Sequence, residues 1–317
     1  MQPLISLKSL VKNYREHRAL DGVDLDVMPG ITGLLGPNGA GKSSLIKAIL
    51  GLVGITSGTG TILGHRLTTD GKKIRNDIGY MPEDDCYIPG MSGVEVVHFA
   101  ASLSGLPKVE GMRRSHEILD FCDMKQERYR AIETYSTGMR QKVKFAAAIV
   151  HDPRFLILDE PTSGLDPEER EALLQRIRVL CVDAGKSVLL STHILPDVQS
   201  VCDQVVILSN GQVRLNKPLA DLNRIQIPTV AISVDQVRDG FVQWLQSRSL
   251  EVTPLDNGNI EVTGESLETL TNDLWRAADA TSTMILSLKP AMNSLENIFM
   301  ETVAEANAAS REVADAR

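Results

Sequence analysis

The strongest constraint on the fold of this 317-residue chain is a glycine-rich segment near its N-terminus. Residues 36–43 read GPNGAGKS and fill every position of the phosphate-binding pattern G-x-x-x-x-G-K-[ST]. An apolar run at 31–35 precedes them and suits a buried strand, and residues 44–50 are typical of a helix closed by Gly51. This succession of strand, glycine loop and helix is the context in which the pattern binds nucleotide phosphates.

Each residue type in this loop has a physical reason to contact phosphate. Glycines let successive backbone N–H groups point inward as an anion nest, and the following helix N-terminus adds partial positive charge. We expect Lys42 to reach the β- and γ-phosphates and the Ser43 hydroxyl to ligate Mg²⁺. The predicted nucleotide-binding residues of the loop are Gly36, Pro37, Asn38, Gly39, Ala40, Gly41, Lys42, Ser43 and Ser44.

Two later apolar segments also end in polar side chains. Residues 155–160 (FLILDE) are typical of a buried parallel strand, and such strands place ligands at their carboxyl ends. Asp159 is then placed to hold Mg²⁺, and Glu160 to orient and deprotonate an attacking water. A second strand at 187–191 brings His193 to the same edge, where we expect contact with the γ-phosphate or that water.

Composition limits the classes of function. Lys plus Arg is 33 and Asp plus Glu is 41, so the net charge of −8 argues against a protein held on nucleic acid by phosphate contacts. The adjacent pair Arg113 and Arg114 is too short for a basic patch. No apolar stretch is long enough to cross a bilayer. Four widely spaced cysteines, without metal-ligand spacing, indicate reduced thiols in a cytosolic protein.

Together, and in this order, these segments resemble an ATP-binding cassette (ABC) ATPase. Residues 135–141 (YSTGMRQ) are similar to the family signature, usually L-S-G-G-Q, and we expect a helix from 141 to 150 after it. Ser136 and Gly138 are retained, whereas Thr137 and Met139 depart from the commonest form. Because Ser136 and Gly138 carry the phosphate-binding rationale, the departures affect the resemblance more than the chemistry.

Three further positions follow the family order. Tyr14 matches the aromatic residue that stacks on adenine. Residues 79–83 resemble the Q-loop, with Glu83 in place of the usual glutamine. That carboxylate can contact Mg²⁺ or water, but its negative charge near the triphosphate puts the timing of hydrolysis in question. Residues 163–166 resemble the D-loop, which implies that Asp166 lies at a dimer interface.

The resemblance covers residues 4–220 and implies a mechanism with two cassettes. Two such domains meet head to tail with two ATP molecules between them, each held by one phosphate loop and by Ser136 and Gly138 of the other subunit. A homodimer is expected, with a related partner subunit as the alternative. Catalysis then falls to Glu160, His193 and Lys42. The family also implies integral membrane transporter subunits, docked near residues 84–93, at the cytoplasmic face of the inner membrane.

The expected fold class is α/β: a P-loop NTPase cassette with an antiparallel β subdomain and a helical insertion, followed by a small ferredoxin-like α+β domain. The cassette is assigned to residues 1–222, with the insertion at about 83–145, and an accessory or regulatory domain to 223–317. The second domain follows the order β-α-β-β-α-β, typical of a ferredoxin-like arrangement. Its predicted elements are 229–234, 237–248, 250–254, 260–262, 266–278 and 284–288, with a last helix over 294–303.

Two other functions stay open at this point. A cassette ATPase acting on nucleic acid or ribosomes is disfavoured by the acidic balance, and no nucleic-acid partner is expected. A nucleotide-gated regulatory subunit with little hydrolysis is kept open by Glu83 and the altered signature. Residues 286–289 and 294–299 resemble the C-terminal extension of bacterial multidrug and antibiotic exporter ATPases, so the leading hypothesis is ATP hydrolysis coupled to export.

Overall fold

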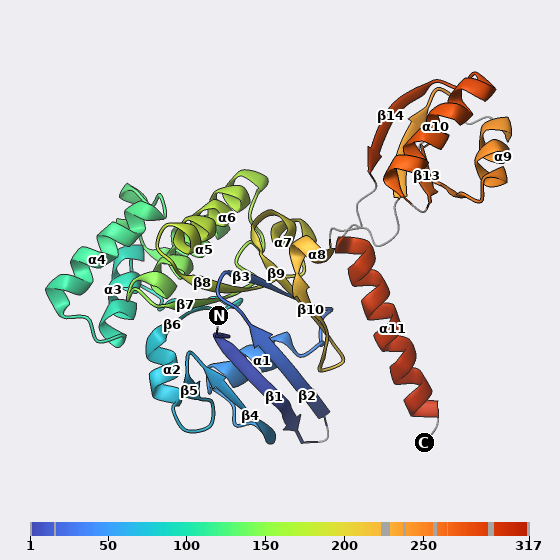
Figure 1. Cartoon of the computed structure of the whole chain (residues 1–317). Coiled ribbons are helices and arrows are strands. Elements are labelled where there is room, and N and C mark those ends of the chain that lie inside the picture. The colour runs from blue at the N-terminus through green and yellow to red at the C-terminus, as the bar shows by residue number, and fades with distance from the viewer. Residues whose placement is uncertain are drawn as a thin grey trace. The chain divides into compact units, whose positions relative to one another are not determined.

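The computed structural model describes residues 2–15, 17–222, 229–236, 239–255, 259–264, 266–290 and 295–315. The chain divides into two compact units, Met1–Leu219 with Phe299–Arg317, and Ala220–Ile298 (Figure 1). These units differ in extent from the expected domains 1–222 and 223–317, because the C-terminal residues group with the first unit. The accessory role expected of residues 223–317 stays a prediction.

A six-stranded sheet forms the centre of the first unit (Figure 1). Its strands are β3 (Ile31–Leu35), β6 (Ile78–Met81), β7 (Phe155–Asp159), β8 (Ser187–Ser191), β9 (Gln204–Ser209) and β10 (Gln212–Pro218). Their order is β10-β9-β3-β8-β7-β6, and all neighbours are parallel except the β9–β10 hairpin. Strands β3, β7 and β8 are buried at every residue, as expected for strands covered on both faces.

A smaller antiparallel sheet lies across helix α1 (Lys42–Ile49) from the central sheet. Its strands are β1 (Ile5–Tyr14), β2 (His17–Val27), β4 (Ser57–Ile62) and β5 (His65–Arg66), in the order β2-β1-β4-β5. Leu45, Ile46 and Ile49 of α1 are fully buried in a core shared with β1, β2, β3 and β7. Each such side chain contributes about 1.5–3 kcal/mol by burial, which fixes α1 and the loop before it.

A helical region lies between β6 and β7, as predicted. Its elements are α3 (Gly93–Leu103), α4 (Lys108–Phe121), η1 (Gln126–Tyr129), η2 (Ile132–Thr134) and α5 (Thr137–Ile149). Ser92 and Glu95 form a capping box at the start of α3. The predicted start of α5 at Gln141 is wrong, because Ser136 caps the helix and accepts a hydrogen bond from the Met139 N–H. Further helices of this unit are α2 (Gly71–Asp77), α6 (Pro167–Val182) and α7 (Leu195–Val201), and the short α8 (Leu219–Leu222) begins at the last residue of Met1–Leu219.

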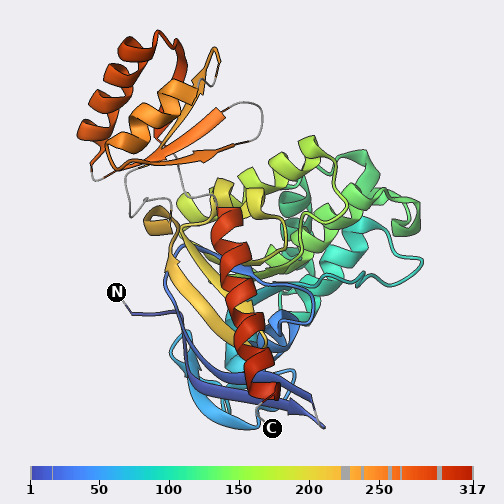
Figure 2. The same ribbon diagram turned by 90° about the vertical axis from the view of Figure 1, so that its right-hand side faces the viewer.

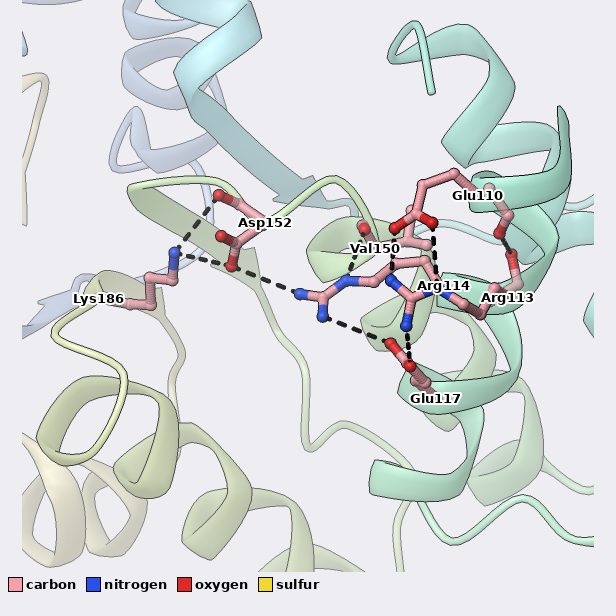
Figure 3. A network of polar contacts seen from close by, with 9 residues as sticks. Glu110, Arg113, Arg114, Glu117, Val150, Asp152 and Lys186 are labelled. Atoms are coloured by element: carbon pink, nitrogen blue, oxygen red, sulfur yellow. Dashed lines mark hydrogen bonds and ion pairs between the residues drawn. The ribbon is translucent and has the colours of Figure 1, made fainter. Parts of the chain in front are cut away.

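Ion pairs join α4 to the segment before β7 (Figure 3). Arg114 donates to the Val150 carbonyl at 3.4 Å and lies 3.5 Å from the Asp152 carboxylate. Lys186 pairs with the same carboxylate at 2.9 Å, while Arg113 pairs with acids of its own helix. Exposed pairs of this kind contribute about 0–1 kcal/mol each. Because both arginines face carboxylates, they form no basic patch, as expected.

The second unit is an antiparallel sheet covered on one face by α9 and α10 (Figure 2). Its elements are β11 (Thr229–Val234), α9 (Asp239–Ser247), β12 (Glu251–Pro254), β13 (Asn259–Thr263), α10 (Leu267–Thr281) and β14 (Ile285–Pro290). In the strand order β12-β13-β11-β14, β11 and β14 are neighbours, and they are the first and last strands of this unit along the chain. The predicted ferredoxin-like arrangement is therefore confirmed. A last helix, α11, runs over Leu295–Asp315, and the predicted first residue Ser294 lies outside the described residues.

Two expectations from composition concern single elements and residues. Across the part of the chain that the structure describes, no helix combines the length and the apolar character needed to span a bilayer. The cysteines are all free thiols: Cys122 and Cys202 are buried, Cys86 is exposed and Cys181 is intermediate. Their expected reduced state stays a prediction.

Candidate nucleotide site

The phosphate loop packs closely against the backbone of β2 where α1 begins. Lys42 extends along the loop, and its Nζ donates to the carbonyls of Gly36 at 2.6 Å and Pro37 at 3.3 Å. Gly41, at the N-cap of α1, has a left-handed φ of 106°. A Cβ at this position would lie 2.6 Å from the Ala19 carbonyl oxygen of β2. The glycine is therefore required by both conformation and space.

The carboxyl ends of β7 and β8 bring the predicted acids and histidine together. Asp159 ends β7 opposite Ser191 of β8. Glu160 follows with φ 49°, and its backbone N–H donates to the Ser191 carbonyl at 2.8 Å. The Glu160 Oε2 lies 2.9 Å from His193 Nδ1 and accepts from the Thr192 hydroxyl at 3.4 Å. The geometry thus pairs the proposed base with the histidine.

Burial and neighbouring charges perturb the titratable groups of this site. Burial lowers the pKa of Lys42, while the carboxylates of Glu160, Asp159 and Glu83 oppose that change. Burial raises the pKa of Asp159; the Ser191 hydroxyl and Lys42 oppose this, and Glu83 and Glu160 add to it. Three acids facing one lysine give the site an excess of negative charge, which favours a cation.

A cleft of about 350 Å³ collects most of the predicted residues. Tyr14 lies at this cleft with 39% of its surface exposed, and the Lys12 ammonium is 4.6 Å from its ring centroid. Sequence reasoning missed His17 and Ala19, for which strand alternation was the only signal. The cleft is lined by Tyr14, His17, Ala19, Pro37, Asn38, Gly39, Ala40, Gly41, Lys42, Ser43, Ser44, Glu83, Asp159, Glu160 and His193.

Ser136, Gly138 and Asp166 do not line this cleft. They lie in two segments that pack against each other elsewhere on the unit, since Gln141 Nε2 donates to the Ser163 carbonyl at 3.2 Å. Ser136 caps α5, and Asp166 caps α6 by accepting from the Glu169 N–H at 2.8 Å. The residues expected to complete the site, Ser136 and Gly138, are therefore separate from the cleft of their own chain.

The cleft offers oxygen ligands to Mg²⁺. The Ser43 hydroxyl and the carboxylates of Asp159 and Glu83 all line it. Within the described ranges, no group of three or more His, Cys, Asp or Glu side chains could hold a metal by itself. One or two carboxylates plus phosphate oxygens are, however, the usual protein environment of Mg²⁺. The donor set fits a cation that shares its ligands with a nucleotide.

Comparisons with known proteins agree with this geometry. A family profile described as ABC transporter matches residues 20–163. The chain is 38% identical to the uncharacterized ABC transporter ATP-binding protein YxlF of Bacillus subtilis (strain 168), over 77% of this chain and 80% of that protein. It is 37% identical to the daunorubicin/doxorubicin resistance ATP-binding protein DrrA of Streptomyces peucetius, over 66% of this chain and 63% of that protein. A solved ATP-binding subunit of an ABC transporter, 34% identical, matches with a TM-score of 0.63 over 70% of this chain and 92% of that one. The chain therefore belongs to the family of ABC transporter ATP-binding proteins and is an ATPase.

Proposed function

We propose that this chain powers export through separate integral membrane subunits, at the cytoplasmic face of the membrane. The observation that carries the proposal is the pairing of Glu160 with His193 in the same cleft as Lys42. Such a pair beside a phosphate loop serves hydrolysis rather than binding alone. The direction of transport rests on the similarity to DrrA, an ATP-binding protein of drug resistance.

In the bound state, the half-exposed ring of Tyr14 stacks on adenine at the mouth of the cleft. The loop N–H groups and Lys42 hold the phosphates, and Lys42 exchanges its bonds to loop carbonyls for phosphate oxygens. Ser43, Asp159 and Glu83 are the residues that hold Mg²⁺. When bound, Mg²⁺ would neutralise negative charge on the triphosphate and on the ADP leaving group.

Hydrolysis depends on the buried carboxylate of Glu160, which is 7% exposed. Glu160 accepts a proton from water as the water oxygen forms a bond to the γ-phosphorus, and the bond from that phosphorus to the β–γ bridging oxygen breaks. His193 Nδ1 lies 2.9 Å from the Glu160 carboxylate, and this contact orients both the carboxylate and the imidazole ring toward the γ-phosphate. Glu83 adds a third negative charge at the cleft, so we expect it to affect the timing of hydrolysis.

The catalytic unit is a head-to-tail dimer. Ser136 and Gly138 lie outside the cleft of their own chain, and a second copy supplies them to the bound γ-phosphate. The N-terminus of α5, which Ser136 caps, adds partial positive charge to the same oxygen atoms. Asp166 lies at the same interface. Two identical chains satisfy this arrangement, and a related partner subunit is the alternative.

An apolar groove beside the Q-loop segment is the proposed docking site for a membrane subunit. It is about 230 Å³ in volume and lies between residues 86–91, α3 and α5. Ile88, Phe99 and Leu103 are 44%, 41% and 74% exposed at or beside it. Apolar side chains gathered at one groove mark a protein contact more than a free surface. A cytoplasmic helix of the membrane partner fits this groove and transmits closure of the cassettes.

Co-purification from gently solubilised membranes tests this proposal, with ATPase activity measured in the same samples. An integral membrane protein at near-equal stoichiometry is expected for the wild type. Leu103→Asp should lose that protein and keep basal ATPase activity, whereas Val182→Asp, an equally exposed change on α6, should keep both. A chain found with ribosomes or DNA and without a membrane protein contradicts the transport assignment.

A further inference from the structure

A fully buried carboxylate that does not line the nucleotide cleft joins the loops that carry Glu160 and His193. Asp197, in the first turn of α7, is 0% exposed. Its Oδ2 accepts from the Thr162 hydroxyl at 2.5 Å, and its Oδ1 accepts from Arg170 Nε. A buried charge persists only where it is paired and hydrogen-bonded. Because each oxygen has its own donor, the carboxylate fixes Thr162 and Arg170 in relation to α7.

These three residues belong to segments that carry the proposed catalytic side chains. Thr162 follows Glu160 by two residues, in the loop after β7. Asp197 follows His193 by four residues, after β8, which pairs directly with β7. Arg170 lies in α6, whose N-cap ends the loop that begins at Glu160. These bonds thus join the two loops outside the cleft, as the contact between Glu160 and His193 joins them within it.

The backbone at Glu160 needs such support. Its φ of 49° is left-handed, a conformation that costs a non-glycine residue free energy and persists only where the surroundings over-determine it. On one side, the Glu160 N–H donates to the Ser191 carbonyl at 2.8 Å. On the other side, two residues later, Thr162 is held by Asp197. The strained residue therefore lies between two fixed points.

We infer that Asp197, with Thr162 and Arg170, is a positioning group that holds the Glu160 carboxylate at hydrogen-bond distance from His193. This inference rests on the proposed roles of Glu160 and His193. It concerns orientation of the base toward water, and the phosphate-binding residues at 36–44 lie outside these bonds. Loss of the group therefore lowers kcat and leaves nucleotide affinity in place.

The most direct test removes one hydroxyl. Thr162→Val has nearly the same shape and lacks the donor to Asp197, while Thr162→Ser keeps that donor. We expect Thr162→Val to lower kcat by about 10-fold or more with KM for ATP changed by less than about 2-fold, because displacement of a catalytic group by about 1 Å can cost about 100-fold. Thr162→Ser should restore kcat to near the wild-type value.

Thr32→Val is the matched control. Thr32 and Thr162 are both 1% exposed. Thr32 lies on β3, outside the two loops, and its hydroxyl donates to Gln204 Oε1 at 3.4 Å. Melting temperatures are measured for all variants, and rates are compared where each is folded. A purely structural role for Thr162 predicts a lower melting temperature with kcat unchanged, as for Thr32→Val, and this result overturns the inference.

A double-variant cycle with Glu160→Gln separates the inference from the assignment of the base. If Thr162 acts through Glu160, Thr162→Val causes no further loss in the slow single turnover of the Glu160→Gln protein. An additional loss equal to that seen in the wild-type background overturns the positioning role. If Glu160→Gln alone keeps wild-type turnover, the assignment of the base fails, and the inference is overturned with it.

Discussion

At the scale of single residues, the phosphate loop depends on close backbone approach, as at Gly41. Gly41 has a φ of 106°, and a Cβ there would meet the Ala19 carbonyl oxygen at 2.6 Å. Gly185 is a matched control, since its φ is 64° and nothing lies within 4 Å of the position of its Cβ. Alanine at either position would adopt a strained left-handed backbone. Of the two, only alanine at position 41 would also clash with a backbone oxygen.

We expect Gly41→Ala to raise the Kd for ATP by more than about 10-fold, because the loop must move away from Ala19. Gly185→Ala should leave the Kd unchanged. It should lower the free energy of unfolding by about 1–2 kcal/mol, because alanine is strained in a left-handed backbone conformation. Equilibrium binding of a fluorescent nucleotide, with urea unfolding alongside, measures both quantities. Equal affinities for the two variants contradict this account of the loop.

A second prediction at this scale concerns Cys122. Burial raises the pKa of its thiol to about 12 from an ordinary value of 9.0, with Arg176 and Lys142 opposing the change. Above pH 9 the unfolded chain releases this proton while the folded chain retains it, so the free energy of unfolding falls as pH rises. The fall approaches about 1.4 kcal/mol per pH unit.

Urea unfolding at pH 8, 9 and 10 measures that slope. The Cys122→Ala protein should lose less stability per pH unit than the wild type, whatever its stability at pH 8. Identical slopes for the two proteins contradict the prediction, because the buried thiol is then not the group that titrates.

Some residues of the site can be predicted from a short stretch of sequence, and others only from the folded structure. The loop at 36–43 and the acids at 159 and 160 are contiguous motifs beside apolar strands, so the sequence alone predicts them. His193 depends on its position after a strand, and its pairing with Glu160 appears only in the fold. Asp197 has no sequence signal, since its burial results from the packing of α6 and α7. Its role therefore had to come from the structure.

At the scale of elements, the middle of α11 is attached to the turn that supports the phosphate loop. Asn210, in the β9–β10 turn, donates from Nδ2 to the Ala306 carbonyl and to Asn307 Oδ1, both at 3.3 Å. The next residue, Gly211, donates its N–H to the Ala40 carbonyl of the phosphate loop at 3.0 Å. One turn thus contacts both the C-terminal helix and the nucleotide site.

Asn210→Gly removes these side-chain bonds and tolerates the φ of 51° at this position. We expect faster amide hydrogen exchange in α11 from Phe299 onward, because the helix loses its polar attachment to the first unit. Exchange in α10 of the second unit is the internal control and should not change. Unaltered exchange in α11 contradicts the view that Asn210 holds this helix.

The sequence predicted elements better than their pairings. The hairpin of β9 and β10 is local, with Asn210 and Gly211 at its turn, whereas the parallel pairing of β9 with β3 joins residues about 170 positions apart. The length of α11 was underestimated, since the helix runs to Asp315 and not to 303, through an alanine- and glutamate-rich segment of high helix propensity. The β-α-β-β-α-β order was predictable because each element of the second unit has its own hydrophobic periodicity and is bounded by turn residues.

At the scale of the whole molecule, the first unit carries the nucleotide cleft and, apart from it, the segment that we propose completes the site of a second copy. The cleft holds the phosphate loop and Glu160, while Ser136 and Gly138 lie outside it. We expect ATP to convert the Glu160→Gln protein from monomer to dimer, because bound nucleotide joins complementary halves and is not consumed. Size-exclusion chromatography with light scattering, with and without ATP, measures this change. Addition of Ser136→Asp, which keeps an N-cap residue on α5 and places a negative charge at the proposed γ-phosphate contact, should abolish the dimer.

The ATPase activity of Glu160→Gln tests the central claim most directly, with phosphate release and ATP binding measured on the same preparation. The exposed neighbour Glu168→Gln, in the first turn of α6, serves as the control. General-base catalysis contributes about 10²–10⁴-fold, so Glu160→Gln should bind ATP like the wild type and hydrolyse it at least about 100 times more slowly, while Glu168→Gln keeps its rate. Turnover near the wild-type rate in Glu160→Gln contradicts the assignment of the base and the mechanism built on it.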